Sequence, residues 1–352
     1  AYRDHVAANN LQYRILGMVA ALQPEDPTEM QAASRAIRGW FAGSSLSPEL
    51  AAALREAYAT LGQPPVAVRS SATAEDLPEL SFAGQQDTFL HVIGAEALLE
   101  AVVRCWSSLW TARAIGYRAR YGFPHGEVAL AVVVQEMVPA EASGVLFTAN
   151  PLTGVRTQTV IDAPLGLGEA LVSGQVEPDH YVVDTAKGEI LEKRLGSKAI
   201  AIRGAEAGGV TATRQAAAQR QALPDPEILR LVELCQRASR EYDSPQDIEW
   251  AWAKERLTLL QSRPITGLYP VPEGLAAEPL RVMISFAAVQ GIPGPITPLG
   301  QDCVRLIFAG GGRLFGFEAT YDRQTVVRMA GERLWVDITA IIRHAVGRKI
   351  VP

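Results

Sequence analysis

Apolar positions recur along the chain with two different periods, and the change of period divides it into segments. Residues 1–60 repeat apolar positions at helical spacing, interrupted by two short Pro/Gly/Ser segments, which predicts three helices. Residues 66–68 and 88–92 are short and apolar and predict strands. Residues 96–121 carry an apolar face of tryptophan and leucine and predict a long helix.

The next part of the chain is rich in β-branched residues. Strand-like segments occur at 128–135, 144–148, 157–161, 180–183 and 190–194. An amphipathic helix is predicted at 225–242, with Pro226 in its first turn. These elements predict an α+β domain over residues 1–266, a Pro/Gly-rich linker at 267–278, and the start of a second domain at 279–352.

A β-hairpin is predicted where the first domain ends. If the turn is formed by the charged residues 254–256, Glu249 lies opposite Gln261. Strand alternation then places Gln261 and Arg263 on the same face as Leu257 and Leu259.

The polar end of this hairpin presents one carboxylate, one amide oxygen and one guanidinium. The oxygens of Glu249 and Gln261 suit Mg²⁺, and the Arg263 fork suits phosphate. The alternative is an ordinary surface ion pair between Glu249 and Arg263, worth about 0 to 1 kcal/mol.

Two further segments carry candidate binding groups. The loop that contains Arg69, Ser70 and Thr73 follows a strand and could enclose phosphate oxygens, although a turn with local hydrogen bonds is the usual explanation of a hydroxyl-rich loop. Residues 135–138 (Gln135, Glu136, Met137 and Val138) end an apolar strand, where backbone groups could bind the edge of a purine. Otherwise, the strand simply leaves the sheet there.

Composition excludes several classes of protein. With 352 residues, 48% apolar and 20% charged, the chain has the composition of a globular protein of two or three domains. Its net charge of −5 provides no basic field for nucleic acid. There is no long apolar run and no signal-peptide pattern, so we expect no membrane partner and a cytoplasmic location. The three cysteines are expected to be buried thiols.

Other common site signatures are missing from the sequence. The five histidines lack the spacing of a zinc site. Gly166 and Gly168 are not followed by the third glycine of a dinucleotide fingerprint, and there is no Walker lysine motif. The oxygen donors therefore favour Mg²⁺ together with ATP.

Several motifs occur together in one order. They are VAVRSSATAED (66–76), SFAGQQ (81–86), QEMV (135–138), SGVLF (143–147), GLGE (166–169), DIE (247–249) and QSRP (261–264). As a set they resemble the ATP-binding domain of the phosphoenolpyruvate synthase, pyruvate phosphate dikinase and rifampicin phosphotransferase family, which has an ATP-grasp-like, two-lobed fold. The resemblance covers about residues 1–266.

The resemblance implies an activity and a role for each matching residue. In the family, the β-phosphoryl of ATP goes to a catalytic histidine on a swivelling domain and then to a small-molecule acceptor. The implied roles are Glu249 and Gln261 as Mg²⁺ ligands, Arg263, Arg69 and Arg113 as phosphate arginines, residues 135–138 as the adenine segment, and Lys198 in the same cleft.

The chain also departs from the family pattern. The Gly-Gly-Lys segment that supplies a phosphate-binding lysine is absent, and none of the histidines has the neighbours of the catalytic histidine. We therefore expect a fragment whose N-terminal segment is missing and whose partner is the catalytic-histidine domain of the same polypeptide. Residues 282–286, 298–300 and 331–338 are similar to the start of the acceptor domain of rifampicin phosphotransferase-like proteins.

Three hypotheses follow. The first is the ATP-binding portion of a dikinase-type phosphotransferase whose acceptor is pyruvate, a rifamycin or another small molecule. The second is a non-catalytic nucleotide-binding or scaffold module, suggested by the missing lysine and histidine. The third, a nucleic-acid-binding protein, is disfavoured by the charge.

Overall fold

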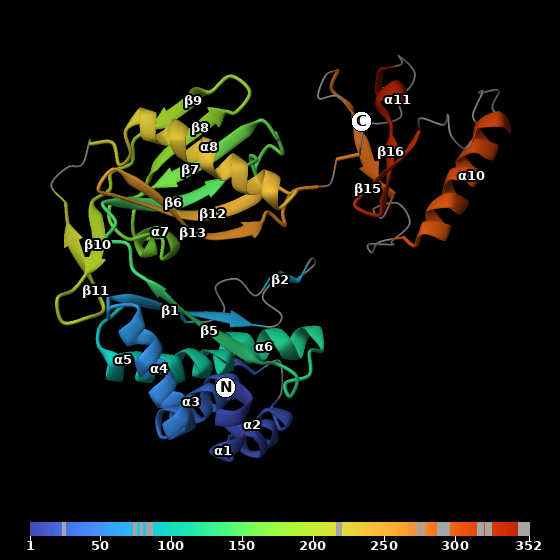
Figure 1. The fold of residues 1–352 in the computed structure, drawn as a ribbon. Coiled ribbons are helices and arrows are strands. Elements are labelled where there is room, and N and C mark those ends of the chain that lie inside the picture. The colour runs from blue at the N-terminus through green and yellow to red at the C-terminus, as the bar shows by residue number, and fades with distance from the viewer. Residues whose placement is uncertain are drawn as a thin grey trace. The chain divides into compact units, whose positions relative to one another are not determined.

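The chain contains both helices and sheets and divides into two compact units, Ala1–Gly267 and Leu268–Pro352. The computed structural model describes all residues except 23–25, 73–75, 78–79, 82–86, 216–219, 270, 273–274, 276–278, 287–295, 315–319, 321–325 and 344–352. The elements of the first unit are labelled in Figure 1.

The first lobe of unit 1 places helices against a small antiparallel sheet. The helices are α1 (Tyr2–Ala8), α2 (Leu11–Ala20), α3 (Pro27–Ala42), α4 (Pro48–Thr60), α5 (Ala95–Ser107) and α6 (Ala112–Tyr121), with a 3-10 turn η1 at Ser108–Trp110. The sheet has the order β4 (Phe89–Val92), β1 (Val66–Ala72), β5 (Leu130–Glu136). A separate short pair is formed by β2 (Asp76–Leu77) and β3 (Leu80–Ser81).

Local chemistry explains where these helices begin and end. Asn10 adopts a left-handed conformation between α1 and α2, so residues 1–60 form four helices rather than the three expected. Thr111 caps α6 by accepting a hydrogen bond from the backbone N–H of Ala114 at 3.1 Å. The single helix expected over residues 96–121 is therefore divided into α5, η1 and α6.

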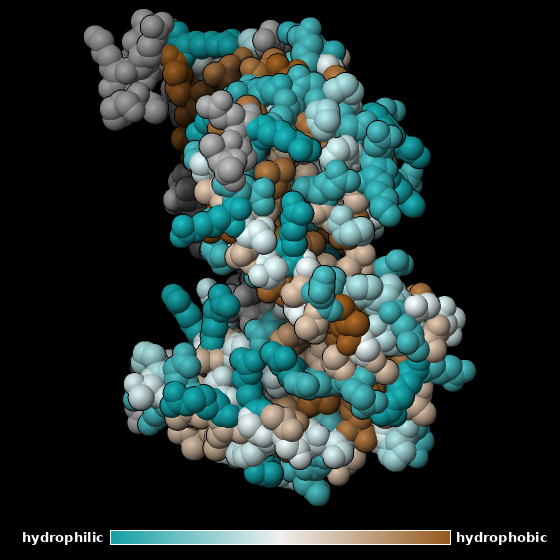
Figure 2. Space-filling view, turned by 90° about the vertical axis from the view of Figure 1, so that its left-hand side faces the viewer, coloured by the Kyte–Doolittle hydropathy of each residue, from teal (hydrophilic) through white to brown (hydrophobic). Residues whose placement is uncertain are grey.

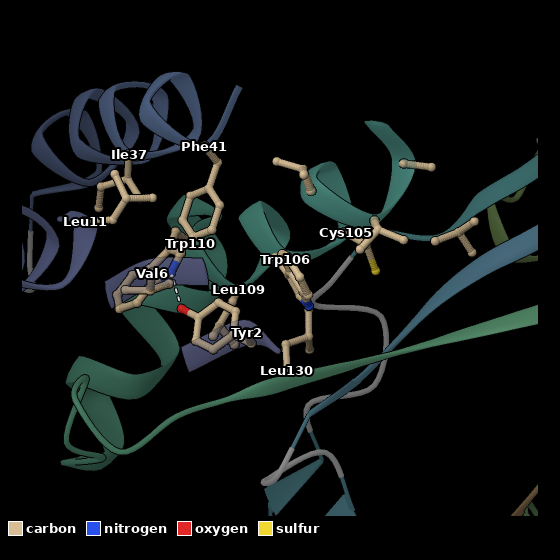
Figure 3. Packing of buried hydrophobic residues seen from close by; sticks show 14 of the residues in the cluster. Tyr2, Val6, Leu11, Ile37, Phe41, Cys105, Trp106, Leu109, Trp110 and Leu130 are labelled. Atoms are coloured by element: carbon tan, nitrogen blue, oxygen red, sulfur yellow. Dashed lines mark hydrogen bonds between the residues drawn. The ribbon is translucent and has the colours of Figure 1, made fainter. Parts of the chain in front are cut away.

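The core of this lobe is aromatic (Figure 3). Trp106, Trp110 and Phe41 are buried between the helices and the sheet, and the indole N–H of Trp110 donates to the hydroxyl of Tyr2 at 3.0 Å. This hydrogen bond gives a partner both to the indole N–H of Trp110 and to the hydroxyl of Tyr2, two buried polar groups that each need one. Burial raises the pKa of Tyr2 to about 12.

The second lobe is built on a six-stranded antiparallel sheet. Its strand order is β13 (Arg256–Pro264), β12 (Gln246–Ala253), β6 (Ala142–Phe147), β7 (Gln158–Ala163), β8 (Asp179–Asp184), β9 (Glu189–Arg194). Helix α8 (Asp225–Glu241) packs Ile228, Leu231 and Cys235 against one face of this sheet. The other additions are the short helix α7 (Glu169–Val172) and the hairpin of β10 (Ile200–Gly204) and β11 (Val210–Arg214), which the sequence did not predict.

Unit 2 is smaller. It contains a three-stranded sheet, β14 (Met283–Ser285), β16 (Arg333–Asp337), β15 (Val327–Ala330), with helices α10 (Pro298–Leu314) and α11 (Thr339–Arg343). Cys303 in α10 is exposed, so the expectation that all three cysteines are buried is wrong for this one. Hydrophilic residues dominate the face of the protein seen in Figure 2. Within the described residues, every helix is too short or too polar to span a bilayer.

Candidate functional site

Strand β1 carries Arg69 on the face of the sheet that points away from the helices. Its register with β5 pairs Ala67 with Gln135 and Arg69 with Val133, so Arg69 and Gln135 lie on the same face as diagonal neighbours. Val66 and Val68 occupy the opposite face and are fully buried. Ser70 belongs to their face by alternation, so β1 does not place it beside Arg69.

The hairpin of β12 and β13 carries the polar residues from the other lobe. Lys254 and Glu255 form a two-residue turn with φ of 49° and 61°, typical of a tight hairpin, so the three-residue turn predicted from the sequence is wrong. Glu249 nevertheless pairs with Gln261, as predicted. A two-residue turn alone would pair Glu249 with Leu260. A β-bulge leaves Leu260 as an extra residue of β13 and so moves the partner of Glu249 to Gln261.

The bulge also decides which side chains share a face. Leu257 and Leu259 pair with Trp252 and Trp250 and pack against the buried cluster of the lobe. Gln261 and Arg263 pair with Glu249 and Asp247 instead, on the opposite face of the strand. The sequence-based expectation that Gln261 and Arg263 share a face with the two leucines is therefore wrong.

Arg69 joins the two lobes at this hairpin, whose outer strand β13 is the edge of the six-stranded sheet (Figure 1). Its Nη2 donates to Glu249 Oε2 at 2.7 Å and to the side-chain oxygen of Gln261. Its Nη1 donates to Gln135 Oε1 at 3.3 Å. Gln135 in turn donates through Nε2 to the backbone oxygen of Leu260 at 3.3 Å, and so binds the bulged residue of β13.

Two more charged groups complete this cluster, which we call the Arg69 cluster (Arg69, Gln135, Asp247, Glu249, Gln261 and Arg263). Arg263 Nη2 lies 3.9 Å from Glu249 Oε1. Asp247 pairs with Arg263 across the hairpin. Burial raises the pKa of Asp247, the neighbouring Glu249 carboxylate raises it further, and the charge of Arg263 opposes both.

Asp247 was not among the site residues proposed from the sequence. Its position two residues before Glu249 on the same strand was the available signal, because alternate residues of a strand share a face.

Other predicted residues lie elsewhere or are held differently. Arg113 is exposed in the first turn of α6 and, among the described residues, makes no hydrogen bond or ion pair with the Arg69 cluster. It lines a pocket of about 550 Å³ with Met30 and Tyr117. Thr73 lies outside the described residues.

Lys198 does not open onto a cleft. Its side chain is fully buried, and its ammonium donates to the equally buried carboxylate of Asp179 and to Gly196 O at 2.9 Å. Asp179 also accepts hydrogen bonds from the backbone N–H of Gly196 at 2.9 Å and of Ala222 at 2.7 Å. The expectation that Lys198 faces the cleft is therefore wrong; the geometry makes it one member of a buried ion pair.

The predicted adenine segment lies at the end of β5, beside the cluster. Glu136 is exposed, whereas Met137 and Val138 are half-buried. The backbone N–H of Met137 donates to Pro65 O at 2.9 Å, and Val138 O accepts from Ala140 N at 2.8 Å. Gln135 therefore connects this segment to the Arg69 cluster through its side chain.

The donor set of the cluster fits Mg²⁺. A carboxylate and an amide oxygen from adjacent strands converge, which is the oxygen chemistry that this ion prefers. Among the described residues no group of three or more His, Cys, Asp or Glu side chains could hold a metal ion by itself. A bound Mg²⁺ would therefore take its other ligands from water and from phosphate.

Comparisons with known proteins identify relatives of this chain. The family model described as pyruvate phosphate dikinase, AMP/ATP-binding domain, matches residues 1–273. A rifampicin phosphotransferase from Streptomyces sviceus is 42% identical over 347 residues, which cover 96% of this chain and 37% of that protein.

Two further relatives give similar values. The rifampicin phosphotransferase of Bacillus subtilis is 40% identical over 342 residues, covering 96% of this chain and 37% of that protein. The phosphoenolpyruvate synthase of Pyrococcus furiosus is 42% identical over 314 residues, covering 85% of this chain and 38% of that protein. The chain thus spans a little more than a third of the length of these relatives. It belongs to the family of the pyruvate phosphate dikinase AMP/ATP-binding domain.

Proposed function

We propose that unit 1 binds ATP with Mg²⁺ at the Arg69 cluster and is the ATP-binding portion of a dikinase-type phosphotransferase. The observation that carries this proposal is the convergence of Arg69 and Gln135 from one lobe with Glu249 and Gln261 from the other. Nucleotides often bind where two parts of a fold meet and offer a few convergent polar groups.

Each side chain has a distinct task in this proposal. Glu249 and Gln261 supply oxygens to Mg²⁺, while Arg69 and Arg263 donate hydrogen bonds to phosphate oxygens. Phosphoryl transfer depends mainly on positioning and on neutralising the charge of the transition state, so two guanidinium groups beside one metal site suit that reaction. The bound Mg²⁺ would bridge phosphate oxygens and neutralise part of their charge.

The fold supports the same assignment. A helical lobe with a small sheet and a second lobe with a larger sheet, linked at the polar cluster, is the arrangement expected of an ATP-grasp-like domain. In this proposal the backbone of residues 135–138 binds adenine. Arg113 would join the phosphates only if α6 approaches the cluster when the nucleotide binds.

The later steps are part of the proposal. The β-phosphoryl group would pass to a histidine on another domain of the full-length polypeptide and then to a small-molecule acceptor. The relatives named rifampicin phosphotransferase and phosphoenolpyruvate synthase support transfer of this kind. These two names differ, so pyruvate and a rifamycin are both candidate acceptors.

Calorimetric titration of the whole chain with ATP, with and without Mg²⁺, tests the proposal. We expect Mg²⁺-dependent binding that Glu249→Gln weakens by about tenfold or more, because a charged ligand is lost. Glu255→Gln is the matched control, since it makes the same change at an exposed position in the turn of the same hairpin. Absence of Mg²⁺-dependent ATP binding by the wild-type chain would refute the proposal.

A further inference from the structure

The two oxygens proposed for Mg²⁺ point at one atom of Arg69. Glu249 Oε2 accepts from Arg69 Nη2 at 2.7 Å, and Gln261 Oε1 accepts from the same nitrogen. Two acceptors on paired residues of adjacent strands define the place that a shared cation would occupy. In this structure that place holds a guanidinium nitrogen.

We propose that Arg69 takes the place of the metal when no nucleotide is bound, and that phosphate oxygens draw it away so that Mg²⁺ can enter. The inference rests on the proposed function. Mg²⁺ binds its oxygen ligands at about 2.0–2.1 Å, so the ion and Nη2 cannot occupy the same position. Their like charges also exclude each other at close range.

The surroundings of Arg69 allow this exchange. Its side chain is one-fifth exposed and reaches the second lobe from the open face of β1. On its own lobe it is held by Gln135 Oε1 at 3.3 Å, a longer bond to a neutral acceptor. Phosphate offers the guanidinium a charged, bidentate acceptor in exchange for one carboxylate oxygen of Glu249 and one neutral amide oxygen of Gln261.

Arg263 lies beside a different oxygen of Glu249 from the one that Arg69 contacts. Its Nη2 lies 3.9 Å from Glu249 Oε1, the oxygen that Arg69 does not use. Within the described part of the chain it donates no hydrogen bond to Gln261. Arg263 can therefore stay beside the carboxylate while a cation binds between Glu249 and Gln261. The exposed Arg256, at the start of β13 in the same hairpin and outside the Arg69 cluster, provides a matched control.

The exchange couples metal and nucleotide. Without nucleotide, Mg²⁺ must displace Arg69 into water, so its affinity is low. With nucleotide, Arg69 gains phosphate partners and the two oxygens become available together. Each ligand then raises the affinity for the other by the same factor, as linkage requires.

Mn²⁺ titrated into the whole chain without nucleotide, with free Mn²⁺ measured by electron paramagnetic resonance, tests the exchange. We expect Arg69→Gln to bind Mn²⁺ about tenfold or more tightly than wild type, because one competing charged hydrogen-bond donor is removed. Arg256→Gln removes the same charge at an exposed position outside the cluster and should change the affinity by less than about threefold. Arg69→Gln combined with Glu249→Gln should lose the gain.

The possible results separate this inference from the proposed function. If Arg69→Gln binds Mn²⁺ no better than wild type, or if Arg256→Gln improves binding equally, Arg69 does not take the place of the metal. Wild-type Mg²⁺-dependent ATP binding would still stand in that case. Circular dichroism checks that each variant is folded, and Arg69→Lys, which keeps the charge but loses the planar fork, should fall between wild type and Arg69→Gln.

Discussion

The buried pair of Lys198 and Asp179 makes Lys198→Met a direct test of whether this lysine supports the fold or binds nucleotide. Both side chains are fully buried, and the ammonium has Asp179 and Gly196 O as acceptors. Methionine fills similar space without charge. The substitution leaves the carboxylate of Asp179 buried without a cation.

The structure sets the expected loss. Two unit charges about 4 Å apart, the separation of an ordinary ion pair, attract by about 4 kcal/mol at an effective dielectric constant near 20. Asp179 keeps three neutral donors, the backbone N–H groups of Gly196 and Ala222 and the hydroxyl of Tyr181 at 3.1 Å, which recover part of this. Breaking one side of a buried pair costs about 3 to 5 kcal/mol in other proteins, so we expect about 3 kcal/mol here.

Urea unfolding followed by tryptophan fluorescence measures the free energy of unfolding, and calorimetry of the folded variant measures its affinity for ATP with Mg²⁺. Lys193→Met is the control, because Lys193 pairs with Asp225 at the surface and should lose less than about 1 kcal/mol. A Lys198→Met variant of unchanged stability that has lost its affinity for ATP would refute the structural role and restore the role predicted from the sequence.

Two other predictions concern pH and backbone packing. Burial, together with the charge of Arg118, lowers the pKa of His125 from 6.5 to about 4. As the pH falls from about 6.5 toward 4, His125 therefore binds a proton in the unfolded chain but not in the folded one, and the free energy of unfolding decreases. The free energy of unfolding is measured at pH 7 and at pH 4.5, and the loss between the two should be about 2 kcal/mol smaller in His125→Gln than in wild type. An equal loss in both proteins would contradict the role of His125. A Cβ on Gly144 would lie 1.9 Å from Asp162 O, so Gly144→Ala should cost about 1 to 3 kcal/mol in thermal unfolding. Gly174→Ala, with positive φ but open space, should cost less, and equal losses would show that the close approach is unimportant.

Local patterns predicted the strands more reliably than the environment of individual side chains. The β-branched segments gave β6 to β9 to within a few residues, because strand propensity and apolar content are local properties. Strand propensity and apolar content gave no indication that Lys198 is buried. Its partner Asp179 begins β8, whereas Lys198 lies between β9 and β10, and only the folded domain brings the two together.

The contact of Arg69 with Glu249, which connects the two lobes, could not be predicted from local patterns either. Arg69 and Glu249 are 180 positions apart, and no periodicity in the sequence relates them. The family resemblance brought both residues into one site. It did not indicate that Arg69 donates to the two oxygens expected to bind metal, because that contact depends on how closely β1 approaches the hairpin.

The bulge at Leu260 explains how one strand serves both the core and the site. Leu257, Leu259, Gln261 and Arg263 are all odd-numbered, so unbroken alternation would place them on one face. The leucines would then lie among the polar residues, or the amide and guanidinium would be buried in the core. One extra residue reverses the alternation, so the leucines pack against the tryptophans while Gln261 and Arg263 reach Glu249 and Asp247. The same residue presents its carbonyl to Gln135, so the irregularity that orients the site also attaches it to the other lobe.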